Sequence, residues 1–285
     1  MTVSRLLEPY KFEFFFHGVI VATLAGGLCG LIGVYVVLRG MSYIGHGLSH
    51  AIFGGAAASA VLGLNFYVGA GIWGFASALM IGRVTRRRLI GSDAAIGVIT
   101  TASFALGLAL IGLFGSASKS IDATLFGSIL GISTTEVWVV VGVTAGAGLV
   151  VFFRYRSLLF TTFDAEVAEV SGVNTARVDA LLMLVLAGSI LATMQVLGVI
   201  LIAATLVIPA VIARMFTNSF SRMLWLSTII GTACGFVGMN LSYQLDISSG
   251  ATIVLVGAAL FLVVFLITGP AGLRRLAATD AHAPP

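Results

Sequence analysis

Long apolar runs recur along almost the whole chain, and each is close to the roughly 20 residues that a helix needs to cross a bilayer. The strict polar and apolar alternation of membrane barrel strands is absent. The runs cover residues 12–38, 44–63, 64–82, 94–114, 136–153, 178–195, 197–216, 223–244 and 249–269. The sequence therefore predicts an all-α, polytopic integral membrane protein with about nine transmembrane helices. A count of about eight also fits, because some adjoining runs lack a charged break between them.

Composition supports a membrane protein. With 59% hydrophobic and 9% charged residues, the chain has too few polar side chains to cover a water-soluble globule. We expect a single permease domain over residues 1–285, with a polar tail at 271–285. The stretch 178–216 is split at Gln195 and Gly198 because one span of that length would overrun a bilayer. Residues 120–133 are too short and mixed for a span, and predict a surface or re-entrant piece.

Glycines are spaced for close helix packing. The chain has 35 of them, and small residues four apart let membrane helices approach one another. Three such pairs are Gly26 and Gly30, Gly142 and Gly146, and Gly231 and Gly235.

Basic residues divide unevenly between the two sets of loops. All but three of the 15 lysines and arginines fall on one side, and the other side holds only Arg5, Lys11 and Lys119. Because basic residues concentrate in cytoplasmic loops, this division predicts an external N-terminus and a cytoplasmic C-terminus. The cytoplasmic set is Arg39, Arg83, Arg86, Arg87, Arg88, Arg154, Arg156, Arg177, Arg214, Arg222, Arg274 and Arg275. The cluster at 83–88 adjoins a span and fits a membrane anchor, so no nucleic-acid partner is expected.

Two histidines, His46 and His50, stand inside otherwise apolar sequence. On a helix over 44–63 they are four residues apart, so both rings project from one face and their nitrogens can meet on one ion. Ionisable groups in a membrane segment are costly and usually face a cavity or a partner, which favours a cation path. The alternative is that each ring only hydrogen-bonds to a neighbouring helix. Two neutral imidazoles suit zinc, whereas manganese more readily takes oxygen ligands.

The predicted external side carries more acids than bases, which mildly favours the approach of cations. The acids considered for this role are Asp122, Glu136 and Asp246.

The longest polar excursion between spans covers about residues 154–177, on the predicted cytoplasmic side. Within it a short helix is predicted, with an aspartate to cap its start, acids in its first turns and a glycine to end it. It lacks the Lys/Arg face of a helix that lies on anionic lipid, so docking to a cytosolic partner is the better interpretation. The residues assigned to this docking are Phe163, Asp164, Glu166, Glu169 and Gly172.

Enzyme chemistry is not supported. A P-loop needs a Gly-Lys pair, and the only lysines follow Tyr10 and Ser118. A His-Glu-x-x-His zinc protease is also unsupported, because Gly47 follows His46 and no glutamate stands nearby as a base. We expect no catalytic residues and no cofactor of the chain's own.

The chain resembles the membrane permease subunit of the ATP-binding-cassette importers for zinc, manganese and iron. The resemblance covers most of the chain and rests on six motifs in the family's order. They are Gly45-His46-Gly47-Leu48-Ser49-His50-Ala51, Asp93-Ala94-Ala95-Ile96-Gly97, Leu125-Phe126-Gly127, the Phe163 to Gly172 segment, Gly198-Val199-Ile200-Leu201 with Ile208-Pro209-Ala210, and Asp246-Ile247-Ser248-Ser249-Gly250-Ala251. Family members usually carry Asp where this chain has His46, whereas His50 matches.

The resemblance implies a multi-pass protein of the bacterial plasma (inner) membrane. It implies a homodimeric or pseudo-dimeric pore, two cytosolic ATPase subunits docked on the Phe163 to Gly172 segment, and an external metal-binding protein. The partner subunit uses the ATP, and zinc is expected to be transported in preference to manganese. Two alternatives stay open: an ion-coupled secondary metal transporter without an ATPase, which would normally carry membrane-embedded carboxylates, and a membrane scaffold, which would not need the histidines.

Overall fold

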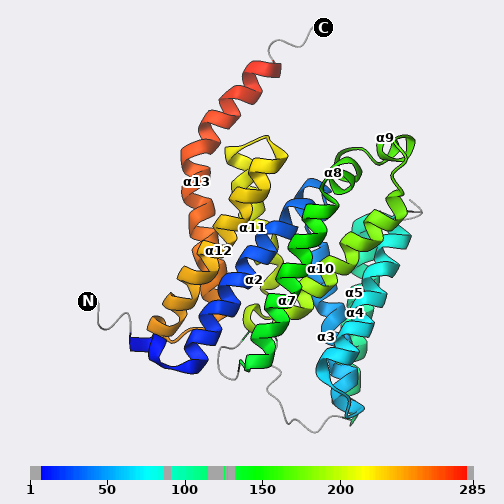
Figure 1. Ribbon diagram of the computed structural model, residues 1–285, viewed down its shortest axis with the longest axis vertical. Helices are drawn as coiled ribbons and strands as arrows, with labels where there is room; N and C mark the ends of the chain where they lie inside the picture. Colours follow the sequence, from blue (N-terminus) through cyan, green and yellow to red (C-terminus); the bar gives the residue numbers. More distant parts are fainter. Residues whose placement is uncertain (1–7, 87–90, 115–124, 126, 128–131, 281–285) are drawn as a thin grey trace.

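The computed structural model describes residues 8–86, 91–114, 125, 127 and 132–280, and every regular element in that part of the chain is a helix (Figure 1). The all-α prediction is therefore confirmed. The elements are η1 (Glu8–Lys11), α2 (Glu13–Leu38), α3 (Ile44–Val61), α4 (Phe66–Arg86), α5 (Ser92–Phe114), α7 (Thr134–Phe153), α8 (Tyr155–Phe163), α9 (Ala165–Val170), α10 (Thr175–Leu197), α11 (Ile202–Phe216), α12 (Phe220–Leu245) and α13 (Ser249–Asp280).

Nine of these helices coincide with the nine apolar runs, within a few residues at most ends. Among the described residues, seven are long and apolar enough to cross a membrane: α2, α4, α5, α7, α10, α12 and α13. The other two are α11, a shorter apolar helix, and α3, which carries both histidines. α13 continues to Asp280, so the predicted polar tail begins as helix.

The long apolar stretch 178–216 breaks at Gly198, as its length required. Gly198 has a φ of +79°, a conformation that residues with a side chain rarely adopt, and its N–H donates to the Met194 carbonyl. α10 ends at Leu197, so Gln195 lies inside the helix rather than at its boundary.

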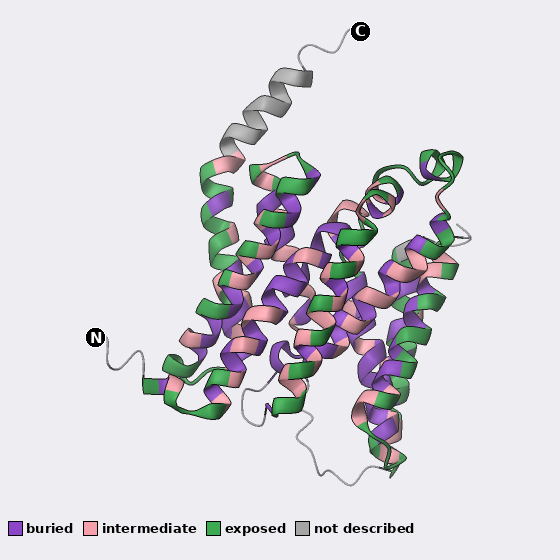
Figure 2. Cartoon of the chain, in the orientation of Figure 1, coloured by how far each residue is buried: buried purple, intermediate pink, exposed green. Residues whose placement is uncertain are grey.

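Among the seven long apolar helices, α2 and α10 are the most buried. The most apolar window of α2 is 78% buried and that of α10 61% buried, against 17% for α7 and 28% for α5 and α13. Figure 2 shows the same contrast, with buried residues along the middle of the bundle and exposed ones on the outer helices. The exposed apolar faces suit contact with lipid or with another membrane subunit.

Glycines bring α2 and α12 into contact. A Cβ on Gly26 would clash with the Gly231 carbonyl, and a Cβ on Gly235 would clash with the Ala22 carbonyl. Close to this contact the Ser227 hydroxyl donates to the Gly30 carbonyl at 2.5 Å. Two of the three glycine pairs identified in the sequence thus interlock across one interface.

The third pair has no such role within this chain. A Cβ on Gly142 or on Gly146 would meet nothing within 4 Å. These two residues lie on α7, whose apolar window is mostly exposed. The four-residue spacing alone did not distinguish the pairs, because it says nothing about which face of a helix a neighbour covers.

The arginines predicted to be cytoplasmic lie, for the most part, at or next to helix ends on one side of the bundle, together with α8 and α9 (Figure 1). These ends are the last turns of α2, α4 and α11 and the first turns of α8, α10 and α12. η1 and the start of α2 lie at the opposite end. This grouping agrees with the arrangement of loops from which the orientation was predicted.

We expect Gly26→Val to destabilise the protein strongly, because the added side chain must push apart two backbones that touch. Overpacking of this kind costs about 1–3 kcal/mol or more. Gly142→Val is the matched control, since the same side chain would enter open space. The thermal midpoint of the detergent-solubilised protein should fall for Gly26→Val and stay near wild type for Gly142→Val. Equal midpoints for the two variants would contradict this account of the α2–α12 contact.

The predicted orientation is tested by cysteine labelling in intact cells. Glu8→Cys, in exposed η1, should react with an impermeant thiol reagent, and Asn218→Cys, in the exposed loop between α11 and α12, should react only after the cells are opened. Native Cys29 and Cys234 are both buried and should contribute little labelling. The reverse pattern would invert the topology.

Candidate metal site

Both histidines lie in the first two turns of α3, and the structure brings their rings together. The Nε2 atoms of His46 and His50 are 3.2 Å apart. The ring centroids are 4.4 Å apart, with the planes at 77° to each other. Both residues are partly exposed, while most of the rest of α3 is buried. The α3 face that is not covered by the chain itself is therefore the face that carries the two imidazoles.

The separation of the two nitrogens suits a shared ion. With zinc–nitrogen bonds of about 2.0–2.1 Å, a tetrahedral angle places two nitrogens about 3.3 Å apart. The same separation allows one neutral ring to donate its Nε2 proton to the other, which is the structural alternative. The distance by itself fits either arrangement.

The surroundings of His50 differ from those of a resident metal ligand. Its ring packs edge-on against Phe104 of α5, with centroids 4.4 Å apart and planes at 82°. Its Nδ1 atom is buried and has no hydrogen-bond partner among the described residues. Permanent metal ligands usually donate this second nitrogen to a carboxylate or carbonyl, which raises their basicity. Packing rather than hydrogen bonding orients His50, and this favours weak and reversible binding.

The described residues supply two ligands and no more. No group of three or more His, Cys, Asp or Glu side chains able to hold a metal ion occurs among them. An ion at this pair therefore keeps positions for water or for groups from another subunit. Such an open shell suits an ion that passes through rather than one that stays.

Ser49, between the two histidines, attaches this part of α3 to the turn between α10 and α11. Its hydroxyl lies 2.8 Å from the His46 carbonyl oxygen and 2.8 Å from the Val199 carbonyl oxygen. Ser49 is fully buried, and its single hydroxyl proton is shared between these two carbonyls or bonds one of them at a time. The position of the histidines is thereby tied to a turn about 150 residues away in the sequence.

The same turn is a meeting point for other motifs. The Ser249 hydroxyl donates to the Val196 carbonyl at 2.9 Å, and the Ile200 N–H donates to the Leu125 carbonyl at 3.3 Å. Gly127 and Gly250 lie so close to the carbonyls of α10 that a Cβ on either would clash. Gly127 is also buried, so this part of the 120–133 segment is not a surface piece.

The predicted docking segment folds as a short helix at the end of the bundle where the arginines gather. Asp164 caps α9 by accepting the N–H groups of Glu166 and Val167. Gly172, with a φ of +82°, ends it: the Gly172 N–H donates to Glu169 and the Val173 N–H to Ala168. This agrees with the cap and the stop expected from the sequence.

The surroundings of α9 show a second helix, which the sequence did not indicate, and exposed apolar side chains, in agreement with the side shared by Val167 and Val170 on a helix. Residues 154–177 contain a second helix, α8. The start of α10 also lies within this range: the helix begins at Thr175, where the Asn174 side chain caps it by accepting the Arg177 N–H. The outer side of the segment is apolar, with Phe163 61%, Val167 54% and Val170 92% exposed.

The comparisons with known proteins decide the family. The sequence model of the ABC 3 transport family matches residues 11–268. The chain belongs to the ABC 3 transport family. It is 36% identical over 251 residues to the manganese transport system membrane protein MntC of Halalkalibacterium halodurans, which covers 88% of this chain and 86% of that one. It is 37% identical over 257 residues to the manganese import system permease protein ScaB of Streptococcus parasanguinis, with coverages of 90% and 91%.

A solved structure shares the fold of this ABC 3 permease. The structure titled "PsaBC from Streptococcus pneumoniae in complex with Fab" matches with a TM-score of 0.83 and 34% identity, over 93% of this chain and 95% of that one. The chain is thus a multi-pass permease of a bacterial ATP-binding-cassette metal importer, as the resemblance implied. It is not an enzyme, and the ATPase is a separate subunit. A secondary transporter is not favoured.

The expected preference for zinc finds no support in the names of these relatives, which state manganese. That expectation rested on the chemistry of two imidazoles and on no other feature of the permease.

The acids assigned to external cation approach have different surroundings. Glu136 forms a capping box with Ser133 at the start of α7 and accepts the Tyr67 hydroxyl at 3.2 Å. Asp246 is exposed at the end of α12 with a φ of +54°. Asp122 lies outside the described residues. Glu136 therefore has a structural task, and an effect of these acids on cations stays a prediction.

Sequence reasoning missed the partners of Arg39. It was counted only as a topological charge, yet its side chain is 11% exposed and bonds Asp179 at 2.7 Å. The available signal was weak: an arginine and an aspartate, each at the end of an apolar run, 140 residues apart.

Proposed function

We propose that the chain forms the pore of an ATP-driven importer for divalent first-row transition-metal ions, with His46 and His50 as a transient station on the path. The observation that carries the proposal is the 3.2 Å approach of the two Nε2 atoms in a permease of a metal-importer family. Few protein ligands, an unpartnered Nδ1 and partial exposure all favour an ion that is released again.

Manganese is the proposed main cargo, because the relatives reported above carry that name. Compared with the Asp that family members usually carry at this position, His46 is proposed to shift selectivity towards zinc, since imidazole is a better ligand for zinc than for manganese. The two statements are compatible: the fold and partners set the class of ion, and the side chain at position 46 sets the ratio between members of that class.

The pore is proposed to contain two copies of this chain. One copy offers two imidazoles at this pair, and a second copy related by symmetry would double the donor set. An external metal-binding protein is proposed to deliver the ion at the end opposite α9. Two cytosolic ATPase subunits are proposed to dock on α9, one on each copy.

The apolar outer side of α9 supports this docking. Val170 is 92% exposed on a segment whose predicted location is the cytosol, where an apolar side chain gains most from being covered by a partner. Phe163 also contacts Phe220 of α12, with ring centroids 5.9 Å apart. A partner that displaces Phe163 would therefore act directly on a side chain of α12.

Metal uptake by the complete importer in proteoliposomes tests the station. We expect His50→Ala to lower the uptake of both manganese and zinc by roughly tenfold or more, because one of two ligands is lost. His46→Asp should keep transport and raise the manganese-to-zinc ratio. His17→Ala is the matched control, since His17 lies on α2, away from the pair, and its ionic neighbour among the described residues is Glu13 at 4.0 Å. Normal uptake by His50→Ala would leave the pair with a structural role only.

Co-purification tests the docking helix. Val170→Asp should release the ATPase subunit, because a charge replaces the most exposed apolar side chain of α9. Asn218→Asp adds the same charge to an exposed loop at the same end and should leave the complex intact. Gly172→Val should also weaken the complex by distorting the left-handed end of α9, at a local cost of about 1 kcal/mol. If Val170→Asp and Gly172→Val both retain the ATPase at the wild-type ratio, α9 is not the docking site.

A further inference from the structure

A chain of hydrogen bonds and ion pairs joins α9 to the end of α2, next to the histidines. Its centre is Arg39, the residue that follows α2. The guanidinium donates from Nη1 to Asp179 at 2.7 Å, from Nη2 to Thr161 at 2.9 Å and from Nε to Thr162 at 3.3 Å. One side chain thus bonds three others, on α8 and α10.

The two threonines hold their hydroxyl protons away from Arg39. Thr161 donates to the carbonyl of Ser157 at 3.0 Å and Thr162 to that of Leu158 at 2.6 Å, both within α8. Their oxygens are therefore left as acceptors for the guanidinium. The arrangement uses the planar fork of arginine, which lysine cannot reproduce with a single ammonium group.

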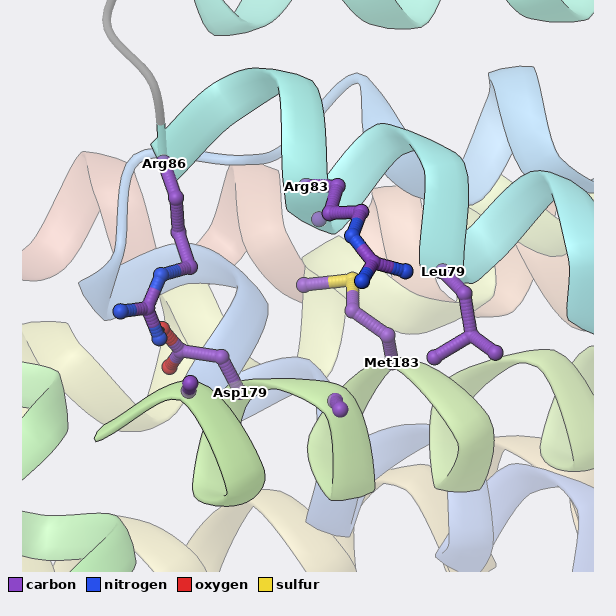
Figure 3. Close-up of a pocket in the computed structure, with 8 residues that line it drawn as sticks. Leu79, Arg83, Arg86, Asp179 and Met183 are labelled. Atoms are coloured by element: carbon purple, nitrogen blue, oxygen red, sulfur yellow. The ribbon is translucent and has the colours of Figure 1, made fainter. Parts of the chain in front are cut away.

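The network continues from Asp179 towards α9. Figure 3 shows Arg86 of α4 facing Asp179 of α10, and their nearest charged atoms are 3.6 Å apart. Arg86 also lies 3.9 Å from Glu169 of α9, which accepts the Thr175 hydroxyl at 2.5 Å. The segment proposed to meet the ATPase is thus connected to Arg39 through α8 and through α10.

Two rigid connections lead from this network to the metal station. The first is the corner of residues 39–43. Gly40 has a φ of +66°, the Gly40 N–H donates to the Val37 carbonyl, the Met41 N–H donates to the Val36 carbonyl, and α3 begins at Ile44. The second is α10 itself, which carries Asp179 near one end and leads into Val199, the partner of Ser49, at the other. A displacement of α8 and α9 therefore reaches α3 at its start, before His46, and at Ser49, between the two histidines.

We infer that Arg39 is a positioning residue that transmits movement of the α8–α9 segment to His46 and His50, through its bonds to Thr161, Thr162 and Asp179. The inference rests on the proposed function, and adds to it the residue that links ATP hydrolysis to the ion path. An arginine serving only as a membrane anchor would extend its charged end into water. Arg39 does the opposite, because its side chain is 11% exposed and three other side chains surround its donors.

The test removes the α8 bonds and keeps the ion pair. In Thr161→Val with Thr162→Val the branched shape remains, and the two hydroxyls are lost both as acceptors for Arg39 and as donors to carbonyls of their own helix α8. The Arg39–Asp179 bond and the fold should persist. Thr161→Ser with Thr162→Ser keeps the oxygens and loses the methyl groups, and is the conservative counterpart. Thr268→Val on α13 is the control for the substitution itself, because the Thr268 hydroxyl bonds the Val264 carbonyl of its own helix.

The measurements are made on the complete importer with its ATPase and binding protein. In proteoliposomes, the amount of manganese taken up per ATP hydrolysed should fall about fivefold or more in the valine pair. A factor of about five is the lower end of the range found when two sites of a protein are coupled. The serine pair and Thr268→Val should match wild type. A wild-type ratio in the valine pair would overturn the inference.

A second measurement does not depend on the ion. Spin labels at Ser42, in the exposed corner, and Asn218 should report a distance change on addition of ATP in the wild type and the serine pair, and none in the valine pair. If the corner moves in the wild type without metal uptake, the proposed function fails while this inference stands. If the corner does not move, or moves equally in the valine pair, the inference is wrong. Should the valine pair not assemble, Thr162→Val alone, which removes the longer bond, carries the same comparison.

Discussion

A helix that ends inside a membrane protein has to find partners for its last carbonyl groups, because no water reaches them. α10 ends at Leu197 among buried residues, and α11, which follows, is the shorter apolar helix. Ser249 from the start of α13 and Ser49 from α3 donate hydrogen bonds to carbonyls at this break. Glycines of neighbouring segments pack directly against the same backbone. The histidine pair flanks Ser49, so its place in the molecule follows from this requirement.

Near the opposite end of α10, the polar contacts involve charged side chains. Burial of Arg39 is tolerated because Asp179 and two threonine hydroxyls surround it, and an arginine buried without partners would cost several kcal/mol. The outcome is a molecule with two polar junctions, one at the α10–α11 turn and one at Arg39, joined by the length of α10 and by α3. Elsewhere many of the contacts are apolar or between glycines, as across α2 and α12, where the Ser227 hydroxyl also bonds the Gly30 carbonyl. Polar groups therefore set which helices must move together.

Local features of this permease were predictable because they depend on neighbours in the sequence. Apolar length located the helices, Gly198 located the break, and Asp164 and Gly172 located the ends of α9. The four-residue spacing of His46 and His50 was enough to place both rings on one side of α3, since helix geometry alone decides that. The same reasoning missed α8, because its few residues lie in a stretch that reads as polar loop.

The sequence by itself determined the class of protein, the helices and the chemical character of the histidine pair, because hydropathy, helical period and side-chain chemistry are properties of short stretches. Only the tertiary structure decided that Gly26 packs and Gly142 does not, that Glu136 caps a helix, that Ser49 reaches Val199, and that Arg39 meets Asp179. Those pairs are set by which faces of distant helices meet. A regular helix offers many faces with similar apolar composition, so the choice among them lies in the packing of the whole bundle.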